Sequence, residues 1–123
     1  MIVPDWAGYL RFRDQFQEVM DPERYPVDWL DRQVLDGTFG VIVGDKAAIV
    51  FTIEEYPTGA KDIHGQLAAG DLKEIVGVLI PRAEQHARDL GCIGAMISSR
   101  PGWAKALASS GYRGHQVTVR KAL

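Results

Sequence analysis

An apolar stripe between Asp71 and Gly91 constrains the fold more than any other feature of the sequence. Along this stretch, apolar residues recur at the spacing of one helix face, and most of the remaining positions are charged or polar. The stripe consists of Leu72, Ile75, Val76, Leu79, Ile80, Ala83, Ala87 and Leu90. It predicts one long helix from Asp71 to Leu90, with Asp71 as the N-cap. Because the stripe is wide, we expect this helix to pack across the face of a sheet.

Pro81 lies inside the predicted helix. Proline has no backbone N–H, so the carbonyl of Gly77 loses its helical hydrogen-bond donor. We therefore expect a kink or a local loosening about one turn before Pro81, within a helix that continues past it.

Strand patterns precede the helix. The stretches from Phe39 to Val43 and from Ala47 to Ile53 are rich in Val, Ile and Phe, which is typical of strands. The compact turn signal Gly44-Asp45-Lys46 between them predicts an antiparallel hairpin. Pro57 to Ala60 breaks the chain again, and Asp62 to Leu67 predicts a third strand that is more polar.

Further elements follow the helix. The apolar stretch from Ile93 to Ile97 predicts a buried strand, and a short helix is expected through Trp103. The stretch from Tyr112 to Val119 predicts a closing strand with Val117 and Val119 on one face.

Two helical patterns begin the chain. Apolar and aromatic residues recur at helical spacing from about Asp5 to Met20. Pro26 and Asp28 then open a second, shorter helix, and Gly37 is placed as its C-terminal cap.

Composition limits the class of protein. A length of 123 residues fits a single domain spanning residues 1–123. The net charge of −2 is too balanced to attract nucleic acid or anionic lipid by bulk electrostatics. No signal segment or membrane-spanning stretch is expected, so the predicted location is cytoplasmic. The single cysteine, Cys92, gives no internal disulfide and no zinc pattern, so no metal site is expected.

The order of elements and three short motifs resemble the GNAT acyltransferases. The motifs are the run A-E-Q-H-A-R-D-L-G from Ala83 to Gly91, the strand C-I-G-A-M-I-S after it, and the ending G-W-A-K-A-L-A-S-S-G-Y with a later V-T-V-R-K-A-L. The resemblance covers Phe39 to Leu123. It implies an α/β (α+β) fold with a mixed, mostly antiparallel central sheet and one long helix packed across it. The two N-terminal helices would accompany this sheet.

The sequence departs from the resemblance at the cofactor loop. GNAT proteins hold acetyl-CoA with a glycine-rich loop, R/Q-x-x-G-x-G/A, at the start of the long helix, where free N–H groups and the helix dipole meet the pyrophosphate. This motif aligns with Leu72 to Gly77, and only Gly77 fits it. Leu72 replaces the Arg or Gln, and Ile75 replaces the first glycine. An alignment that starts at Gln66 also misplaces the glycine.

The charge at the start of the predicted helix also disfavours binding of acetyl-CoA. The carboxylate of Asp71 would accept the first free N–H groups and place negative charge where the pyrophosphate should lie. Lys73 offers partial compensation. If coenzyme A does bind, Lys73, Gly77 and Arg100 are the residues expected to contact it.

The expected catalytic residues also differ. In the resemblance, the usual tyrosine acid falls on Leu107, which cannot donate a proton to a departing thiolate. If the chain is an enzyme, Glu54 and Glu55 at a strand end and His64 on the next strand are the candidates for the general base. Solvated carboxylates and a histidine without a catalytic role are the alternatives.

Two classes of function follow. Arg100 with Gly102-Trp103 resembles the small GNAT-like proteins encoded by tailed phages, some of which are internal virion proteins. The first hypothesis is a domain without cofactor or catalysis that binds virion or host proteins, located in the host cytoplasm or the virion. The second is a divergent acyl-CoA-dependent N-acyltransferase that uses acetyl-CoA.

Overall fold

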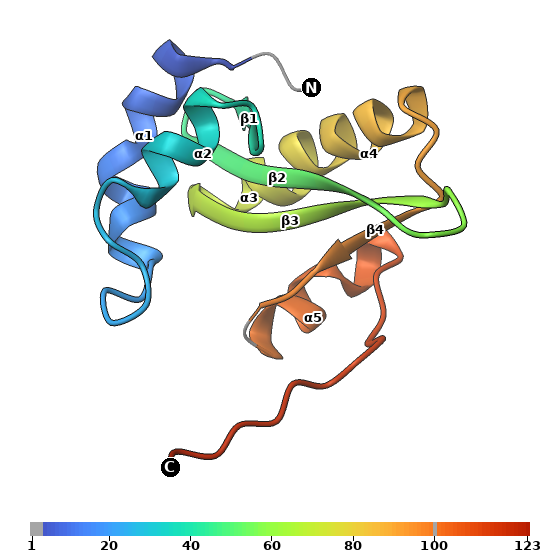
Figure 1. Cartoon of the computed structure of the whole chain (residues 1–123). Coiled ribbons are helices and arrows are strands. Elements are labelled where there is room, and N and C mark those ends of the chain that lie inside the picture. The colour runs from blue at the N-terminus through green and yellow to red at the C-terminus, as the bar shows by residue number, and fades with distance from the viewer. Residues whose placement is uncertain (1–3, 100) are drawn as a thin grey trace.

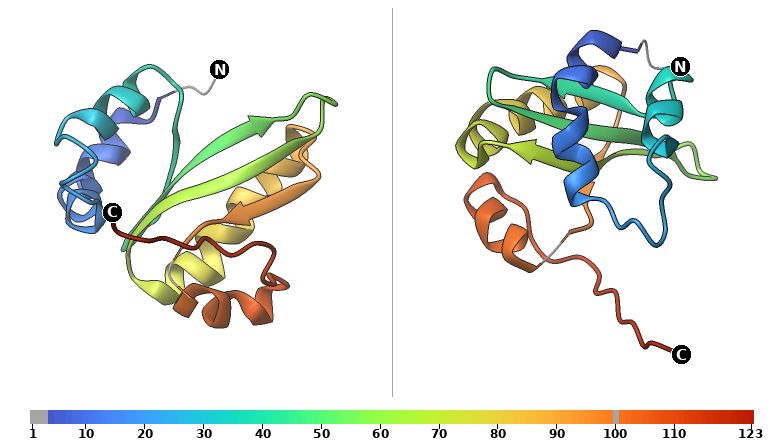
Figure 2. Two further views of the ribbon diagram at one scale, coloured as in Figure 1. Left: turned by 60° about the horizontal axis from the view of Figure 1, so that its bottom comes forward. Right: turned by 90° about the vertical axis from the view of Figure 1, so that its left-hand side faces the viewer.

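Helices pack against both faces of a central sheet in the computed structural model, which describes residues 4–99 and 101–123 (Figures 1 and 2). The sheet has four strands in the order β1 (Gly40–Val43), β2 (Ala47–Glu55), β3 (Lys61–Gly70) and β4 (Gly94–Ile97). The pairs β1–β2 and β2–β3 are antiparallel, and β3 and β4 are parallel. The mixed, mostly antiparallel sheet that we expected is therefore confirmed, and β3 extends further at both ends than the sequence indicated.

The two N-terminal helices cover one face of the sheet (Figure 2). Helix α1 (Trp6–Val19) begins after Asp5, whose carboxylate accepts the N–H of Gly8 at 3.0 Å. Helix α2 (Trp29–Leu35) is followed by Gly37, whose positive φ of 80° ends it as predicted.

Alternation along β2 divides the apolar residues between the two faces. Ile49 and Phe51 point to the face covered by the long helix, and Ala48 and Val50 point to α1 and α2. The core on the long-helix face contains Ala47, Ile49, Phe51, Ile63, Ile75, Leu79, Ile80, Ala83, Ala87 and Leu107. The core on the α1 face contains Tyr9, Phe12, Phe16, Leu30, Val34, Phe39, Ala48, Val50 and Ala69.

The long helix is continuous but changes its winding before Pro81. It consists of α3 (Leu72–Glu74), a π-helical segment η1 (Ile75–Leu79) and α4 (Ile80–Asp89). In η1 the N–H of Ile80 donates to the carbonyl of Ile75. Pro81 then stands in the first turn of α4, where its missing N–H is tolerated. The loosening predicted before Pro81 is therefore confirmed.

Only the middle of the apolar stripe is buried against the sheet. Ile75 and Leu79 are 3% and 0% exposed, as expected. Leu72 and Leu90, at the two ends, are about half exposed. The sheet face is shorter than the helix, so the stripe extends past its partner at each end.

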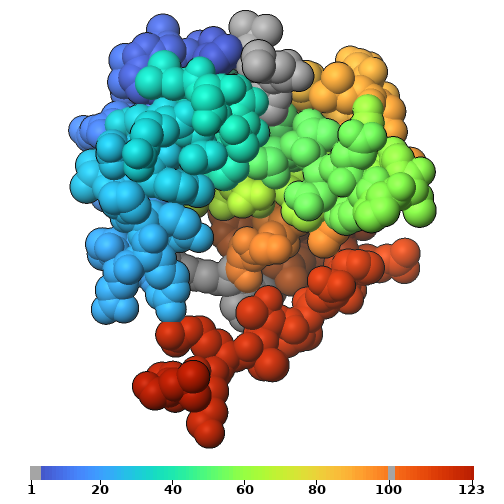
Figure 3. All heavy atoms as spheres, in the orientation of Figure 1, coloured from blue at the N-terminus to red at the C-terminus, as the bar shows by residue number. Residues whose placement is uncertain are grey.

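Two predictions for the C-terminal third were wrong. The strand expected to be buried, β4, lies at the edge of the sheet, and Ile93 just before it is 79% exposed. The closing strand expected from Tyr112 to Val119 does not form. Among the described residues, no strand of the sheet lies beside this segment to pair with it. After the short helix α5 (Pro101–Leu107) and a 3-10 turn, η2 (Ala108–Ser110), the last residues extend away from the rest of the molecule (Figures 1 and 3).

Candidate functional site

The strands β3 and β4 separate partway along the sheet. They pair only from Asp62 and Gly94 to Gly65 and Ile97, whereas β3 continues to Gly70. The separation begins at Gln66, a bulge that has no partner on β2. Beyond Gly65, no strand among the described residues pairs with this edge of β3.

The bulge also changes which side chains face each core. Ile63, before it, belongs to the core on the long-helix face, and Ala69, after it, belongs to the core on the α1 face. In a regular strand these residues, six positions apart, would point to the same face. The extra residue therefore switches which positions of β3 face each core, and β3 and β4 separate from this point on.

An open pocket of about 520 Å³ lies at the fork where β3 and β4 separate. Its mainly apolar lining comes from α1, the end of β3, the start of the long helix and α5. The lining residues are Gln15, Glu18, Val19, Ala68, Ala69, Gly70, Leu72, Ile75, Gly102, Trp103 and Ala106. This volume falls within the range of small-molecule sites.

Carboxylates occupy the start of the long helix. Asp71 Oδ2 accepts the N–H of Glu74 at 3.0 Å, which confirms Asp71 as the N-cap. Glu74 Oε1 in turn accepts the N–H of Lys46 at 3.1 Å. The helix start thus carries two negative side chains, the reverse of what a pyrophosphate needs.

The residues expected to contact coenzyme A do not converge on the pocket. Lys73 and Gly77 are exposed, and neither belongs to the lining. A Cβ atom added at Gly77 would meet no atom within 4 Å, so packing does not demand glycine there. Arg100 lies outside the described residues.

Leu107 occupies the position where the resemblance places a tyrosine acid. Its side chain is 2% exposed and packs in the core on the long-helix face. The nearby phenol of Tyr112 is engaged elsewhere, because its hydroxyl donates to Glu84 Oε2 at 3.0 Å. Burial and this hydrogen bond raise the pKa of Tyr112, so the phenol keeps its proton at neutral pH.

A polar cluster forms around His64 toward the other end of β3. The Tyr56 hydroxyl lies 3.2 Å from His64 Nε2, 3.2 Å from Asp62 Oδ2 and 3.9 Å from Met96 Sδ. A hydroxyl has one proton, so if Tyr56 donates to Asp62 its oxygen can accept from the His64 ring. Desolvation and the bond to Asp62 raise the pKa of Tyr56.

The two glutamates lie at the same end of the sheet as this cluster. Glu54 and Glu55 are exposed at the end of β2, opposite Asp62 and Lys61 of β3. The negative charge of Glu54 contributes to the raised pKa of Tyr56. None of the predicted catalytic residues lines the pocket, and His64 is four residues from Ala68, or about 13 Å along β3.

Sequence reasoning placed His64 but missed Tyr56 and Asp62. Asp62 and His64 are two residues apart on one strand and therefore share a face. That alternation was a signal that could have linked them. Tyr56, beyond the end of β2, reaches them only because the β2–β3 hairpin folds back.

No protein-family model matches the sequence, and no curated protein matches it either. Solved structures do match the fold. A GCN5-related N-acetyltransferase from Ralstonia eutropha JMP134 is similar with a TM-score of 0.70 and 18% identity, covering 99% of this chain and 95% of that one. Glucosamine-6-phosphate N-acetyltransferase from Arabidopsis thaliana is similar with a TM-score of 0.69 and 12% identity, covering 96% and 93%.

A predicted acetyltransferase with acetyl-CoA from Clostridium acetobutylicum is also similar, with a TM-score of 0.69 and 8% identity over 96% of this chain and 92% of that one. Among the described residues, no helix has the length and apolar character needed to cross a membrane.

The similarity to these solved structures shows that the chain has the fold of the GNAT N-acetyltransferases, as its sequence motifs predicted.

Proposed function

We propose that this GNAT-fold domain works by binding a protein partner and does not transfer acyl groups from acetyl-CoA. The observation that carries the proposal is the Asp71 cap. Its carboxylate already accepts the Glu74 N–H, one of the donors that a pyrophosphate at this helix start would need. The negative charges of Asp71 and Glu74 would also repel a phosphate.

The position of Leu107 supports the same proposal. Loss of a proton donor for the departing thiolate removes a second chemical requirement of acetyl transfer. Because Leu107 is buried in the core, packing alone explains why an apolar residue stands at this position. The resemblance to small phage proteins supports a virion or host protein as the partner, met in the virion or in the host cytoplasm.

Calorimetric titration with acetyl-CoA at low salt tests the proposal. We expect no saturable heat at micromolar ligand, and any residual affinity in the millimolar range. This corresponds to about 4 kcal/mol of binding free energy, where ~8 kcal/mol gives micromolar affinity. Saturable micromolar binding with a matching rise in melting temperature would overturn the proposal.

The variant Asp71→Asn is the informative comparison. It keeps a side-chain oxygen that can cap the helix and removes the charge. If repulsion by Asp71 limits binding, this variant should bind acetyl-CoA a few times more tightly than the wild type, as about 1 kcal/mol of exposed charge interaction implies. Asp89→Asn, the same charge change on an exposed side chain at the other end of the long helix, serves as the control.

A second candidate is a divergent acyl-CoA-dependent N-acyltransferase. The fork pocket and the Tyr56–His64–Asp62 cluster favour it, because an apolar cavity and a histidine lie along one strand, about 13 Å apart. His64 would then take the proton of an amine acceptor, with Glu54 and Glu55 attracting the cationic amine. Lys73, Gly77 and Arg100 would hold the cofactor, and Lys73 and Gly77 would then bind it outside the lining of the fork pocket.

Acetyl transfer to a panel of amines tests this candidate. Turnover by the wild type that falls at least a hundredfold in His64→Ala, with the melting temperature retained, would support it. Turnover that His64→Ala leaves unchanged would exclude His64 as the base.

A further inference from the structure

The edge of β3 that faces the fork has no partner strand beyond Gly65. On its other edge β3 pairs with β2 as far as Gly70, whereas β4 diverges from it after Gly65 (Figure 1). Part of the backbone N–H and C=O groups of residues 66–70 therefore face the fork, and no described strand pairs with them. This open stretch is about 17 Å long. Extended peptides add to a sheet at open strand edges of this kind.

Small side chains leave room beside this edge. Ala68 and Gly70 line the fork pocket from β3. Gly102 and Ala106 line it from α5, and a Cβ atom added at Gly102 would meet no atom within 4 Å. Small residues let a further backbone approach a strand closely. The pocket of about 520 Å³ thus has space for a short piece of extended chain.

Apolar side chains around the pocket are left in contact with water. Val19 and Leu72 belong to the lining, yet they are 47% and 50% exposed. Trp103 lines the pocket from α5 and is half-buried. An occupant with apolar side chains would remove this surface from water, which favours binding.

The charge beside the pocket favours a cationic occupant. Glu18 is the only ionisable residue in the described lining, and it is exposed. Asp71, also exposed, lies between two residues of the lining. Lys73 and Lys105 lie on α3 and α5 but outside the lining. Two carboxylates, Glu18 and Asp71, therefore border an apolar pocket, and lysine or arginine would complement them.

We propose that the protein partner inserts an extended peptide into the fork, in which apolar side chains alternate with lysine or arginine. The peptide adds as a strand to the open edge of β3 at residues 66–70. Its apolar side chains contact Val19, Leu72 and Trp103, and its cationic side chains, on the opposite face, reach the two carboxylates. This inference rests on the proposed function, because it specifies where the partner binds and by what chemistry.

Fluorescence anisotropy with dye-labelled peptides and the full chain tests the inference, at about 150 mM salt so that weak surface attraction is screened. The probe K-V-K-L-K-V-K should bind with a Kd below about 100 µM. The peptide E-V-E-L-E-V-E should bind about tenfold more weakly or worse, because its carboxylates meet like charges.

Backbone methylation of the probe tests whether the peptide pairs as a strand. One form is methylated at the nitrogens of its second, fourth and sixth residues, and the other at those of its third and fifth. Alternate N–H groups of a strand point to opposite edges. One form should therefore bind about tenfold more weakly than the other, since only one blocks the pairing edge.

The variant Glu18→Gln/Leu72→Ser tests the location. It should weaken binding of K-V-K-L-K-V-K about tenfold, because it removes a charge and an apolar contact. Asp89→Asn/Leu90→Ser is the matched control, with an exposed acid and a 42% exposed leucine at the other end of the long helix. It should leave the Kd unchanged, and both variants should keep the wild-type melting temperature. Hydrogen exchange should show newly protected amides within residues 67–70 of the complex.

Four results would overturn the inference. They are a K-V-K-L-K-V-K peptide that does not saturate the protein at about 1 mM, an acidic peptide that binds as tightly, equal binding by the two double variants, and a complex without protection in residues 67–70. None of these results contradicts the proposed function, which fails instead if acetyl-CoA binds at micromolar concentration. The two titrations therefore distinguish failure of the docking site from failure of the function.

Discussion

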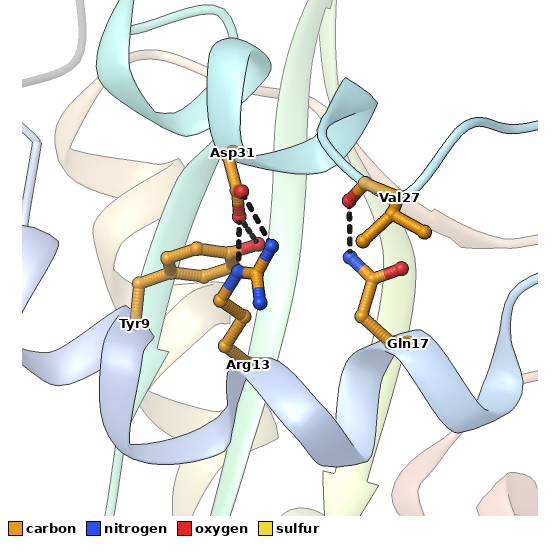
Figure 4. Close-up of polar contacts among 5 residues, drawn as sticks. All are labelled: Tyr9, Arg13, Gln17, Val27 and Asp31. Carbon is orange, nitrogen blue, oxygen red and sulfur yellow. Dashed lines mark hydrogen bonds and ion pairs between the residues drawn. The ribbon is translucent and has the colours of Figure 1, made fainter.

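Asp31 on α2 joins the two N-terminal helices through one carboxylate. It accepts hydrogen bonds from the Tyr9 hydroxyl at 2.6 Å and from two nitrogens of Arg13 at 2.8 Å each (Figure 4). The Arg13 guanidinium is the main cause that lowers the pKa of Asp31, and the Tyr9 hydroxyl adds to it. On the next turn of α1, Gln17 donates to the carbonyl of Val27 at 2.8 Å. Asp31 is therefore the main polar link between α1 and α2, beside the apolar residues that the two helices share in one core.

Asp31→Asn should destabilise the protein by about 1 kcal/mol at pH 7, a small value because the ion pair of Arg13 and Asp31 is partly exposed, at 30% and 17%. A lowered folded-state pKa gives stability that is present above the unfolded pKa of about 3.9 and is lost as pH falls through the lower folded value. The difference between wild type and variant should therefore shrink below about pH 4. Urea unfolding at pH 7 and at pH 3 measures both effects.

Asp28→Asn is the matched control on the same helix. Asp28 faces Arg32 at 3.6 Å in a pair whose side chains are 62% and 66% exposed, so its loss should have no measurable effect. Equal unfolding curves for the two variants would mean that the Asp31 carboxylate adds no more than an exposed charge.

The junction of β2, β3 and the long helix depends on one glycine. Gly70 has φ of 99°, and a Cβ atom there would lie 2.1 Å from the carbonyl oxygen of Lys46. The same carbonyl accepts the N–H of Asp71 at 3.0 Å, which sets the direction in which the long helix leaves the sheet. A side chain at position 70 would therefore displace the element that starts at Asp71.

Gly70→Ala should cost about 2 kcal/mol more than Gly59→Ala. Gly59, in the β2–β3 hairpin, has a similar φ of 87° but nothing within 4 Å of an added Cβ, so it bears only the cost of the positive φ. Comparing the two variants by urea unfolding isolates the steric contribution. Equal losses of stability would show that the chain at Gly70 moves aside without strain.

The sequence predicted elements whose pattern is local. The long helix and its loosened turn followed from the apolar spacing and from Pro81, and the β1–β2 hairpin followed from its turn residues. Tyr112 to Val119 shows the limit, because a strand also needs a partner edge that lies elsewhere in the chain. The bulge at Gln66 was unreadable for the same reason, since it exists only relative to β2.

The candidate site was predictable only in part. Asp71 was correctly placed as the cap because capping depends on neighbours in sequence. The pocket at the fork was not, since its lining combines α1, β3 and α5, which are far apart in the chain. His64 was picked out without Tyr56, because a contact between the end of a hairpin and the strand that follows needs the folded backbone.

The two cores share a single sheet, so the whole molecule should unfold in one step. Ile49 and Val50 are neighbours on β2 yet belong to different cores, and neither core can lose its sheet face while the other keeps it. Trp103 packs beside the core on the long-helix face, whereas Phe16, which is fully buried, belongs to the core on the α1 face. A substitution at Phe16 therefore perturbs the core on the α1 face, and the fluorescence of Trp103 reports on the core on the long-helix face.

Phe16→Ala should lower the unfolding free energy by roughly 3 to 5 kcal/mol, through lost apolar burial and the cavity left behind. In a background where Trp6→Phe and Trp29→Phe leave Trp103 as the only indole, its fluorescence in urea should shift together with the circular dichroism. Leu10→Ala, on the same helix but 48% exposed, should shift both signals far less. If Phe16→Ala moved the helical signal to lower urea while the Trp103 transition stayed in place, the α1 face would unfold independently. The prediction that residues 1–123 form one domain would then be wrong, because a shared sheet must transmit the loss of either core to the other.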